Sequence, residues 1–234
     1  MNCANKLTAA AFAVLLAATA ACISAGAWHW SGNVVSEEAC SAKVVALTFD
    51  DGPHPKKTPE ILEILDKYDV HATFFAVGEN AEAHPEIVKA EIDAGHEIGN
   101  HTYTHVFLKN ADCEKVKREI CAFDDYMLEE FEYKPKLLRP PGGLYNDSVC
   151  TFAESMGYSV ILWSVDTRDW AHTSAGAIAD TILDNVSGGD IILCHDFIGG
   201  EAHTAQALRT VIPQLKNMGY EFVTVSELMA LSEK

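Results

Sequence analysis

The sequence predicts an α/β fold in which about seven βα units form a parallel sheet, closed like a barrel, with helices outside. Three observations support this. Strand-like and helix-like stretches alternate from Lys43 onward, which is the pattern of repeated βα units. The chain lacks the glycine fingerprint of dinucleotide-binding sheets, which favours barrel-like closure over an open sheet. Chemically capable residues recur directly after predicted strands, at the edge where such barrels build active sites.

Seven short strands are predicted where apolar or β-branched runs stop at charged residues, glycine or proline. They cover residues 44–49, 72–77, 97–99, 137–138, 159–165, 190–194 and 221–223.

Amphipathic stretches between these runs predict helices. The first begins with Thr58 as N-cap and Pro59 in its first turn, whereas Gly95, Gly157 and Gly219 end three others. The predicted helices start at Thr58, then cover residues 81–94, 112–132, 147–156, 174–186 and 202–218, and a short last helix starts at Ser226.

The N-terminal segment differs in composition from the rest. Residues 7–27 are largely apolar and end in the small residues Ala25-Gly26-Ala27, and a bilayer is spanned by about 20 such residues. We therefore expect a signal peptide or membrane anchor over residues 1–27, with a lipoprotein at Cys22 as a third alternative. A linker over 28–42 and a single domain over 43–234 would follow. Each alternative places the domain outside the cell or in the cell envelope.

Composition narrows the partners. The chain has 17 Lys and Arg against 34 Asp and Glu, a formal charge of −17. This negative charge argues against nucleic acid as a binding partner and against binding to anionic membranes, except through the N-terminal segment. A neutral or cationic substrate is easier to accept. Of the seven cysteines, five follow residue 27, without a CxxC pair, so neither a disulfide pattern nor a thiolate zinc site is predicted. The sequence does not indicate an oligomeric state.

Two motifs suggest a metal site. TFDDGP puts Asp50 and Asp51 directly after an apolar strand, and HTYTH puts His101 and His105 four residues apart, on one face of a predicted helical turn. One Asp and two His make an open ligand set for a divalent cation and leave the other Asp as a base. Zinc suits this set best, and cobalt or nickel also fit. Taken alone, TFDDGP is more typical of a surface turn, and the histidine pair of exposed or core histidines, but together the two motifs indicate metal-assisted hydrolysis.

Other strand ends carry further candidates. Arg139 either holds Asp50 by a bidentate pair or is a solvated side chain of a rigid loop. His195 ends an apolar strand and is either a core histidine or a general acid kept protonated by a carboxylate such as Asp169. Trp170 is either a packing residue or a pocket wall on which a sugar ring stacks.

Taken together, these motifs resemble those of the polysaccharide deacetylases of carbohydrate esterase family four. The resemblance covers about residues 44–231. It rests on five motifs in order: TFDDGP at 48–53, HxxxH at 101–105, RPPGG at 139–143, DxxDW at 166–170 and LxH at 193–195. It implies a distorted (β/α) barrel of about seven units that removes N- or O-acetyl groups from sugar polymers.

By this resemblance, Asp51, His101 and His105 hold the metal, and Asp50 is the catalytic base, oriented by Arg139. The metal and the base would then lie side by side.

The resemblance implies roles for five further residues. His195 is the acid, tuned by Asp169. The backbone N–H of Gly142 helps to hold the oxyanion, and Leu193 and Trp170 line a pocket for the acetyl methyl group. Many members carry a side chain where Gly142 stands, so the substrate contacts of that loop are expected to differ.

The predicted function is therefore metal-dependent N-deacetylation of an N-acetylglucosamine polymer, with peptidoglycan favoured over chitin. Two alternatives are an O-acetyl esterase of the xylan type and a carbohydrate-binding pseudoenzyme.

Overall fold

The computed structural model describes residues 34–38 and 42–232, all of which belong to one compact unit. The predicted export segment, residues 1–27, lies outside the described residues. None of the helices that the described residues form combines the length and apolar character that crossing a bilayer requires.

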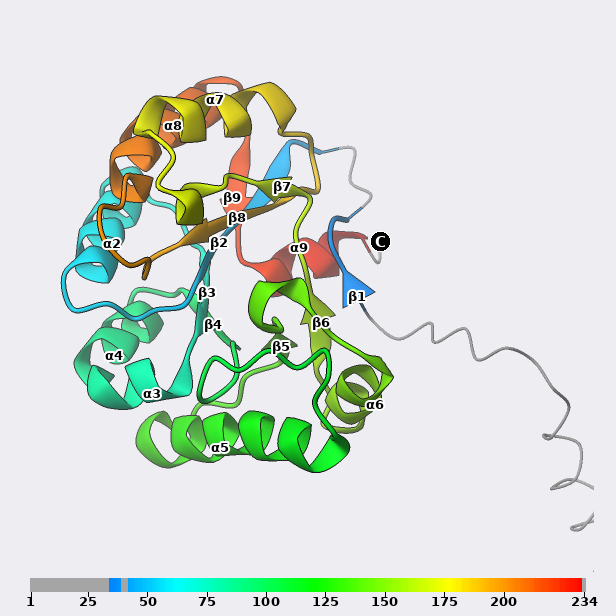
Figure 1. Ribbon diagram of the computed structural model, residues 1–234. Coiled ribbons are helices and arrows are strands. Elements are labelled where there is room, and N and C mark those ends of the chain that lie inside the picture. Colours follow the sequence, from blue (N-terminus) through cyan, green and yellow to red (C-terminus); the bar gives the residue numbers. More distant parts are fainter. Residues whose placement is uncertain (1–33, 39–41, 233–234) are drawn as a thin grey trace, which may run out of the picture. The chain divides into compact units, whose positions relative to one another are not determined.

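The described residues form one sheet, in which every strand pairing is parallel (Figure 1). The strands are β1 (Val34–Val35), β2 (Val44–Asp50), β3 (Thr73–Ala76), β4 (Glu97–Asn100), β5 (Leu137–Leu138), β6 (Ser159–Ile161), β7 (Val165–Asp166), β8 (Ile191–His195) and β9 (Glu221–Val223). Their order is β1-β6-β5-β4-β3-β2-β8-β7, with β9 beside β2. The predicted α/β fold with a distorted, barrel-like parallel sheet is confirmed.

Residues 34–38 contact two separate parts of the sheet, at β6 and just before β8. β1 pairs with β6, Glu37 forms an antiparallel bridge with Asp190 just before β8, and the N–H of Glu38 donates to the carbonyl of Gly189 at 2.9 Å. Residues 28–42 were predicted to be a linker, which is wrong for residues 34–38. Their backbone groups find partners on two strands that are distant in sequence.

Helices surround the sheet in the described part of the chain. They are α2 (Lys57–Tyr68), α3 (Gly78–Ala83), α4 (Pro85–Asp93), α5 (Cys113–Phe131), α6 (Asp147–Ser155), α7 (Ala175–Asn185), α8 (Thr204–Asn217) and α9 (Val225–Ser232), with 3₁₀ turns η1 (Pro141–Gly143) and η2 (Asp169–Ala171).

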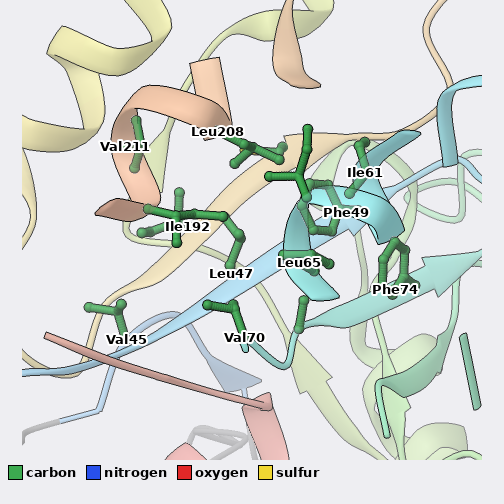
Figure 2. Packing of buried hydrophobic residues seen from close by; sticks show 14 of the residues in the cluster. Val45, Leu47, Phe49, Ile61, Leu65, Val70, Phe74, Ile192, Leu208 and Val211 are labelled. Carbon is green, nitrogen blue, oxygen red and sulfur yellow. The ribbon is translucent and has the colours of Figure 1, made fainter. Parts of the chain in front are cut away.

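The main hydrophobic core lies between the sheet and the helices that include α2 and α8. Leu47 and Phe49 of β2 are fully buried there, and they belong to one cluster with Leu65, Leu208 and Val211 (Figure 2). Neighbouring residues of a strand face opposite sides of the sheet. The residues of β2 that alternate with Leu47 and Phe49 therefore face the inside of the barrel.

A second core fills the end of the barrel where the strands begin. Ala46 of β2 packs there with Val225 and Leu228 of α9. The inner face of β2 becomes polar toward its other end, where Thr48 and Asp50 lie, both buried. On β2, the polar side chains are thus found toward the C-terminal end of the strand.

The predicted helix over residues 81–94 is two helices, α3 and α4. They meet at His84, whose φ of −138° and ψ of 55° are not helical, and Pro85 opens α4. A proline lacks an N–H and disfavours helical geometry in the residue before it, so the helix breaks there.

Two further predictions need correction. The strand predicted over residues 159–165 is split, because β6 pairs with β1 and β5 whereas β7 pairs with β8. Thr58 is not an N-cap, since α2 begins at Lys57 without a side-chain cap. The buried hydroxyl of Thr58 instead donates to Asp196 Oδ2 and accepts from the N–H of His54.

Candidate active site

The predicted site residues gather at the C-terminal ends of parallel strands. Asp50 ends β2, His101 follows β4, Arg139 follows β5, Asp169 follows β7 and His195 ends β8. A parallel sheet brings such residues to one edge, even where they are far apart in sequence.

Asp50 and Asp51 both approach His101, although they are adjacent in the chain. Asp51 has a φ of 76°, which ends the extended strand. Asp50 Oδ2 lies 3.7 Å and Asp51 Oδ1 lies 3.2 Å from His101 Nε2. The next residue must be glycine, because a Cβ on Gly52 would lie 2.0 Å from Oδ2 of Asp196.

The two histidines lie in a loop, so the helical turn predicted for them is wrong. Thr102 and His105 have φ values of 69° and 55°, which a right-handed helix does not accommodate. Asn100 Oδ1 accepts a hydrogen bond from the N–H of Thr102 at 2.8 Å. His105 nevertheless reaches the same carboxylate as His101, with its Nε2 3.0 Å from Asp51 Oδ1.

Glu119 of α5 supports this loop. Its carboxylate accepts hydrogen bonds from the N–H of Tyr103 at 3.1 Å, the N–H of Thr104 at 2.9 Å and the hydroxyl of Thr104 at 2.9 Å. The sequence analysis missed Glu119, because nothing local distinguishes it from the other acidic residues of a long amphipathic helix.

The donor set fits a divalent cation. One ligand atom each of Asp51, His101 and His105 lies within 4.8 Å of the others. His101 Nδ1 is 2.7 Å from the carbonyl oxygen of Arg139. That oxygen only accepts, so Nδ1 carries a proton, and Nε2 is the ring nitrogen left to bind a metal. A metal-binding nitrogen that faces a carboxylate oxygen is the arrangement that a cation between them would stabilise.

Asp51 stays ionised in this setting. Burial acts to raise the pKa of Asp51, but hydrogen bonds and positive charge from His101 and His105 in their protonated forms outweigh burial and hold this pKa well below its usual range. The carboxylate is therefore available as a ligand.

Arg139 is fully buried and fixes Asp50. Its Nη1 donates to Asp50 Oδ1 at 2.7 Å and to Thr48 Oγ1 at 2.8 Å. Its Nη2 donates to the carbonyl of Leu162 at 2.9 Å, so the pair with Asp50 is not the predicted bidentate one. The guanidinium carbon lies 4.0 Å from the ring centroid of Phe75, a cation–π contact. Arg139 is thereby held in one orientation.

His195 and Asp169 form a buried pair. His195 Nδ1 is 2.7 Å from Asp169 Oδ1, and Asp169 Oδ2 accepts from the backbone N–H of His195 at 2.8 Å and from the hydroxyl of Thr204 at 2.7 Å. Burial acts to lower the pKa of His195, but the hydrogen bond and charge of Asp169, helped by Asp50 and Asp51, raise it to about 9. The imidazole is thus charged at neutral pH.

The three remaining candidate residues are Gly142, Trp170 and Leu193. Each is close in sequence to a site residue already described, at the same edge of the sheet. Gly142 is exposed within η1 and has a φ of 62°. Trp170 is 47% exposed and its N–H groups donate to Asp169 and Asp166, whereas Leu193 is buried in β8. The methyl pocket that Leu193 and Trp170 are expected to share stays a prediction.

An open cavity borders the metal-binding set. It has a volume of about 260 Å³ and reaches Asp51 and His105. Its other walls are Val77, Glu79, Asn80, Phe197 and Gly199. A ligand can therefore approach the two side chains from solvent.

A carboxylate held by a buried arginine stands beside a charged histidine at one end of a βα barrel, and this is the kind of acid–base pair that hydrolytic barrel enzymes use. Residues 37–161 match the family model for polysaccharide deacetylase. The match covers just over half of the chain, and the chain belongs to this family.

Relatives and solved structures agree with this assignment. The chain is 41% identical over 201 residues to a peptidoglycan-N-acetylglucosamine deacetylase of Bacillus cereus, covering 85% of this chain and 94% of the relative. A crystal structure of a peptidoglycan N-acetylglucosamine deacetylase superposes with a TM-score of 0.83 at 37% identity, covering 88% of this chain and 96% of that chain. A pseudoenzyme of carbohydrate esterase family four from Bacillus anthracis superposes with a TM-score of 0.79 at 30% identity. The match covers 85% of this chain and 69% of the pseudoenzyme chain.

Proposed function

We propose that this polysaccharide deacetylase is a metal-dependent N-deacetylase that acts on N-acetylglucosamine units of peptidoglycan. The names of the relatives support the polymer. One observation carries the metal dependence: the Nε2 atoms of His101 and His105 lie 3.2 and 3.0 Å from a single oxygen of Asp51.

Asp51, His101 and His105 would hold the cation. Zinc is the first choice for two imidazoles and a carboxylate, and cobalt or nickel are alternatives. A divalent metal bound there acts as a Lewis acid on the acetyl carbonyl and lowers the pKa of water beside it.

Two side chains of the protein accept and donate the protons of the reaction. Asp50, oriented by Arg139, takes a proton from the attacking water. His195, charged at neutral pH, gives a proton to the nitrogen of the leaving amine. The backbone N–H of Gly142 donates to the oxyanion of the tetrahedral intermediate. The C–N bond breaks, and acetate and a free amino sugar are released.

Acetate release tests this proposal. Metal-stripped and metal-restored protein is incubated with peptidoglycan, chito-oligosaccharides and acetylated xylan. We expect release from peptidoglycan that disappears on stripping and returns with zinc. Preference for xylan would indicate an O-acetyl esterase, and binding of glycans without any release would indicate a pseudoenzyme. Full activity of the stripped protein would refute metal dependence.

We also propose that the protein works outside the cell or in the cell envelope. The apolar composition of residues 7–27 and the small residues that end this stretch support export. Cell fractionation with mass determination of the mature chain tests this, because full-length protein confined to the cytosol would contradict it.

A further inference from the structure

Exposed apolar side chains border the candidate active site. Seven large apolar side chains of the described residues are at least 36% exposed. Four of them lie in loops that follow the C-terminal ends of strands: Phe107, Leu144, Tyr145 and Trp170. Exposed apolar groups gathered at one site mark a binding surface more often than groups scattered singly.

Phe107 is the most exposed of these side chains. It is 60% exposed and follows the candidate metal ligand His105 by two residues. The two rings have centroids 6.3 Å apart and are tilted by 52°. Phe107 therefore lies beside the candidate metal centre and not in the core.

Phe107 also lies over Gly142, whose N–H is the proposed oxyanion donor. A Cβ on Gly142 would lie 3.1 Å from Phe107 Cε1 and 3.8 Å from Leu144 Cγ. The missing side chain of Gly142 leaves room for both. Phe107, Gly142 and Leu144 thus form a continuous apolar surface, here called the Phe107 shelf.

The neighbours of Phe107 already anchor its loop. Leu108 is fully buried, and Val106 is partly buried in the same cluster with α5 and α6. Phe107 is not part of that cluster and is 60% exposed, so anchoring of the loop does not account for its ring. The apolar ring is available for a ligand.

We propose that the Phe107 shelf binds the sugar ring next to the one being deacetylated. The inference rests on the proposed function and adds a specificity-determining residue to it. The C–H face of a pyranose is apolar and packs on an aromatic ring. The shelf therefore favours a polymer over a single acetylated sugar.

The test compares N-acetylglucosamine with its tetrasaccharide. The measured quantity is kcat/KM for the tetrasaccharide divided by kcat/KM for the monosaccharide. Phe107→Ala is expected to lower this ratio about tenfold, mainly by raising KM for the tetrasaccharide. A change of about tenfold corresponds to the loss of one aromatic contact. Phe107→Trp should restore the ratio. Leu128→Ala, which removes a side chain of similar exposure (57%) on α5, should keep the wild-type ratio. An unchanged ratio in Phe107→Ala would overturn the proposal.

Two further measurements separate the alternatives. Zinc affinity by chelator competition should be the same in Phe107→Ala and wild type; a matching loss of zinc affinity would mean that Phe107 supports His105 and would overturn the proposal. Tetrasaccharide binding by calorimetry in an Asp50→Asn background does not need turnover. If wild type releases no acetate, the proposed function fails, while roughly tenfold weaker binding on adding Phe107→Ala would still support the shelf and equal binding would refute it.

Discussion

Asp50 and His195 are register partners on the neighbouring strands β2 and β8. Adjacent parallel strands lie about 4.8 Å apart, so the proposed base and acid stand side by side on one face of the sheet. Arg139 holds the first and Asp169 the second. A water molecule and a leaving amine bound between them would each have a proton-transfer partner.

Asp50→Asn should remove the base and keep the fold. The amide still accepts a hydrogen bond from Arg139 but takes no proton, so kcat is expected to fall by a factor of about 10² to 10⁴. Acetate release from a chito-oligosaccharide measures this. Asp66→Asn, on the exposed surface of α2, is the matched control. A variant that keeps most of the wild-type rate would rule out Asp50 as the base.

The alkaline limit of activity should follow His195. Its pKa is raised to about 9 from an ordinary value of 6.5, so the acid form is present below that pH, and kcat should fall as the pH rises through about 9. The pair should stabilise the fold fully below pH 6.5 and lose this contribution between 6.5 and about 9.

Asp169→Asn should move this limit to lower pH, because it removes the carboxylate that keeps His195 charged. The pH profile of kcat and an NMR titration of the imidazole report the shift. Asp166→Asn changes a carboxylate that accepts from Arg168 and Trp170, and it should leave the limit in place. An unmoved limit in Asp169→Asn would contradict the assignment of His195 as the acid.

Glu119→Ala should weaken metal binding without touching a ligand. The three hydrogen bonds that Glu119 accepts hold the loop between His101 and His105, and loss of such support typically costs about 10- to 100-fold in metal affinity. Zinc competition with a chromophoric chelator measures it. Glu114→Ala, in the exposed first turn of the same helix, serves as the control, and equal affinities in the two variants would show that the loop needs no such support.

Gly52→Ala should destabilise the fold. The added Cβ would lie 2.0 Å from Asp196 Oδ2, and relieving that clash should lower the free energy of unfolding by about 1–3 kcal/mol. Gly176→Ala is the matched control, because a Cβ there meets nothing within 4 Å and alanine favours the helix α7. Thermal unfolding of the two variants should shift Tm in opposite directions; equal values would refute the steric argument.

Much of the site could be predicted because its residues follow strands in recognisable motifs. TFDDGP marks the end of β2 by its break in apolar character, and LxH marks the end of β8. The geometry of HTYTH could not be predicted, since the spacing of His101 and His105 suits a helical turn as well as a loop. Hydrogen bonds that Asn100 and Glu119 accept from the backbone between the two histidines stabilise the loop conformation.

The sequence by itself determined the order of the βα units and the residues that end the strands, because apolar runs and the residues that break them are local properties of the chain. Only the tertiary structure decided which distant groups meet. The carbonyl of Arg139 sets the tautomer of His101 across 38 residues, and Thr204 supports Asp169 across 35. The strand at residues 34–35 and the exposure of Phe107 were decided in the same way, since pairing and burial depend on neighbours that folding alone brings together.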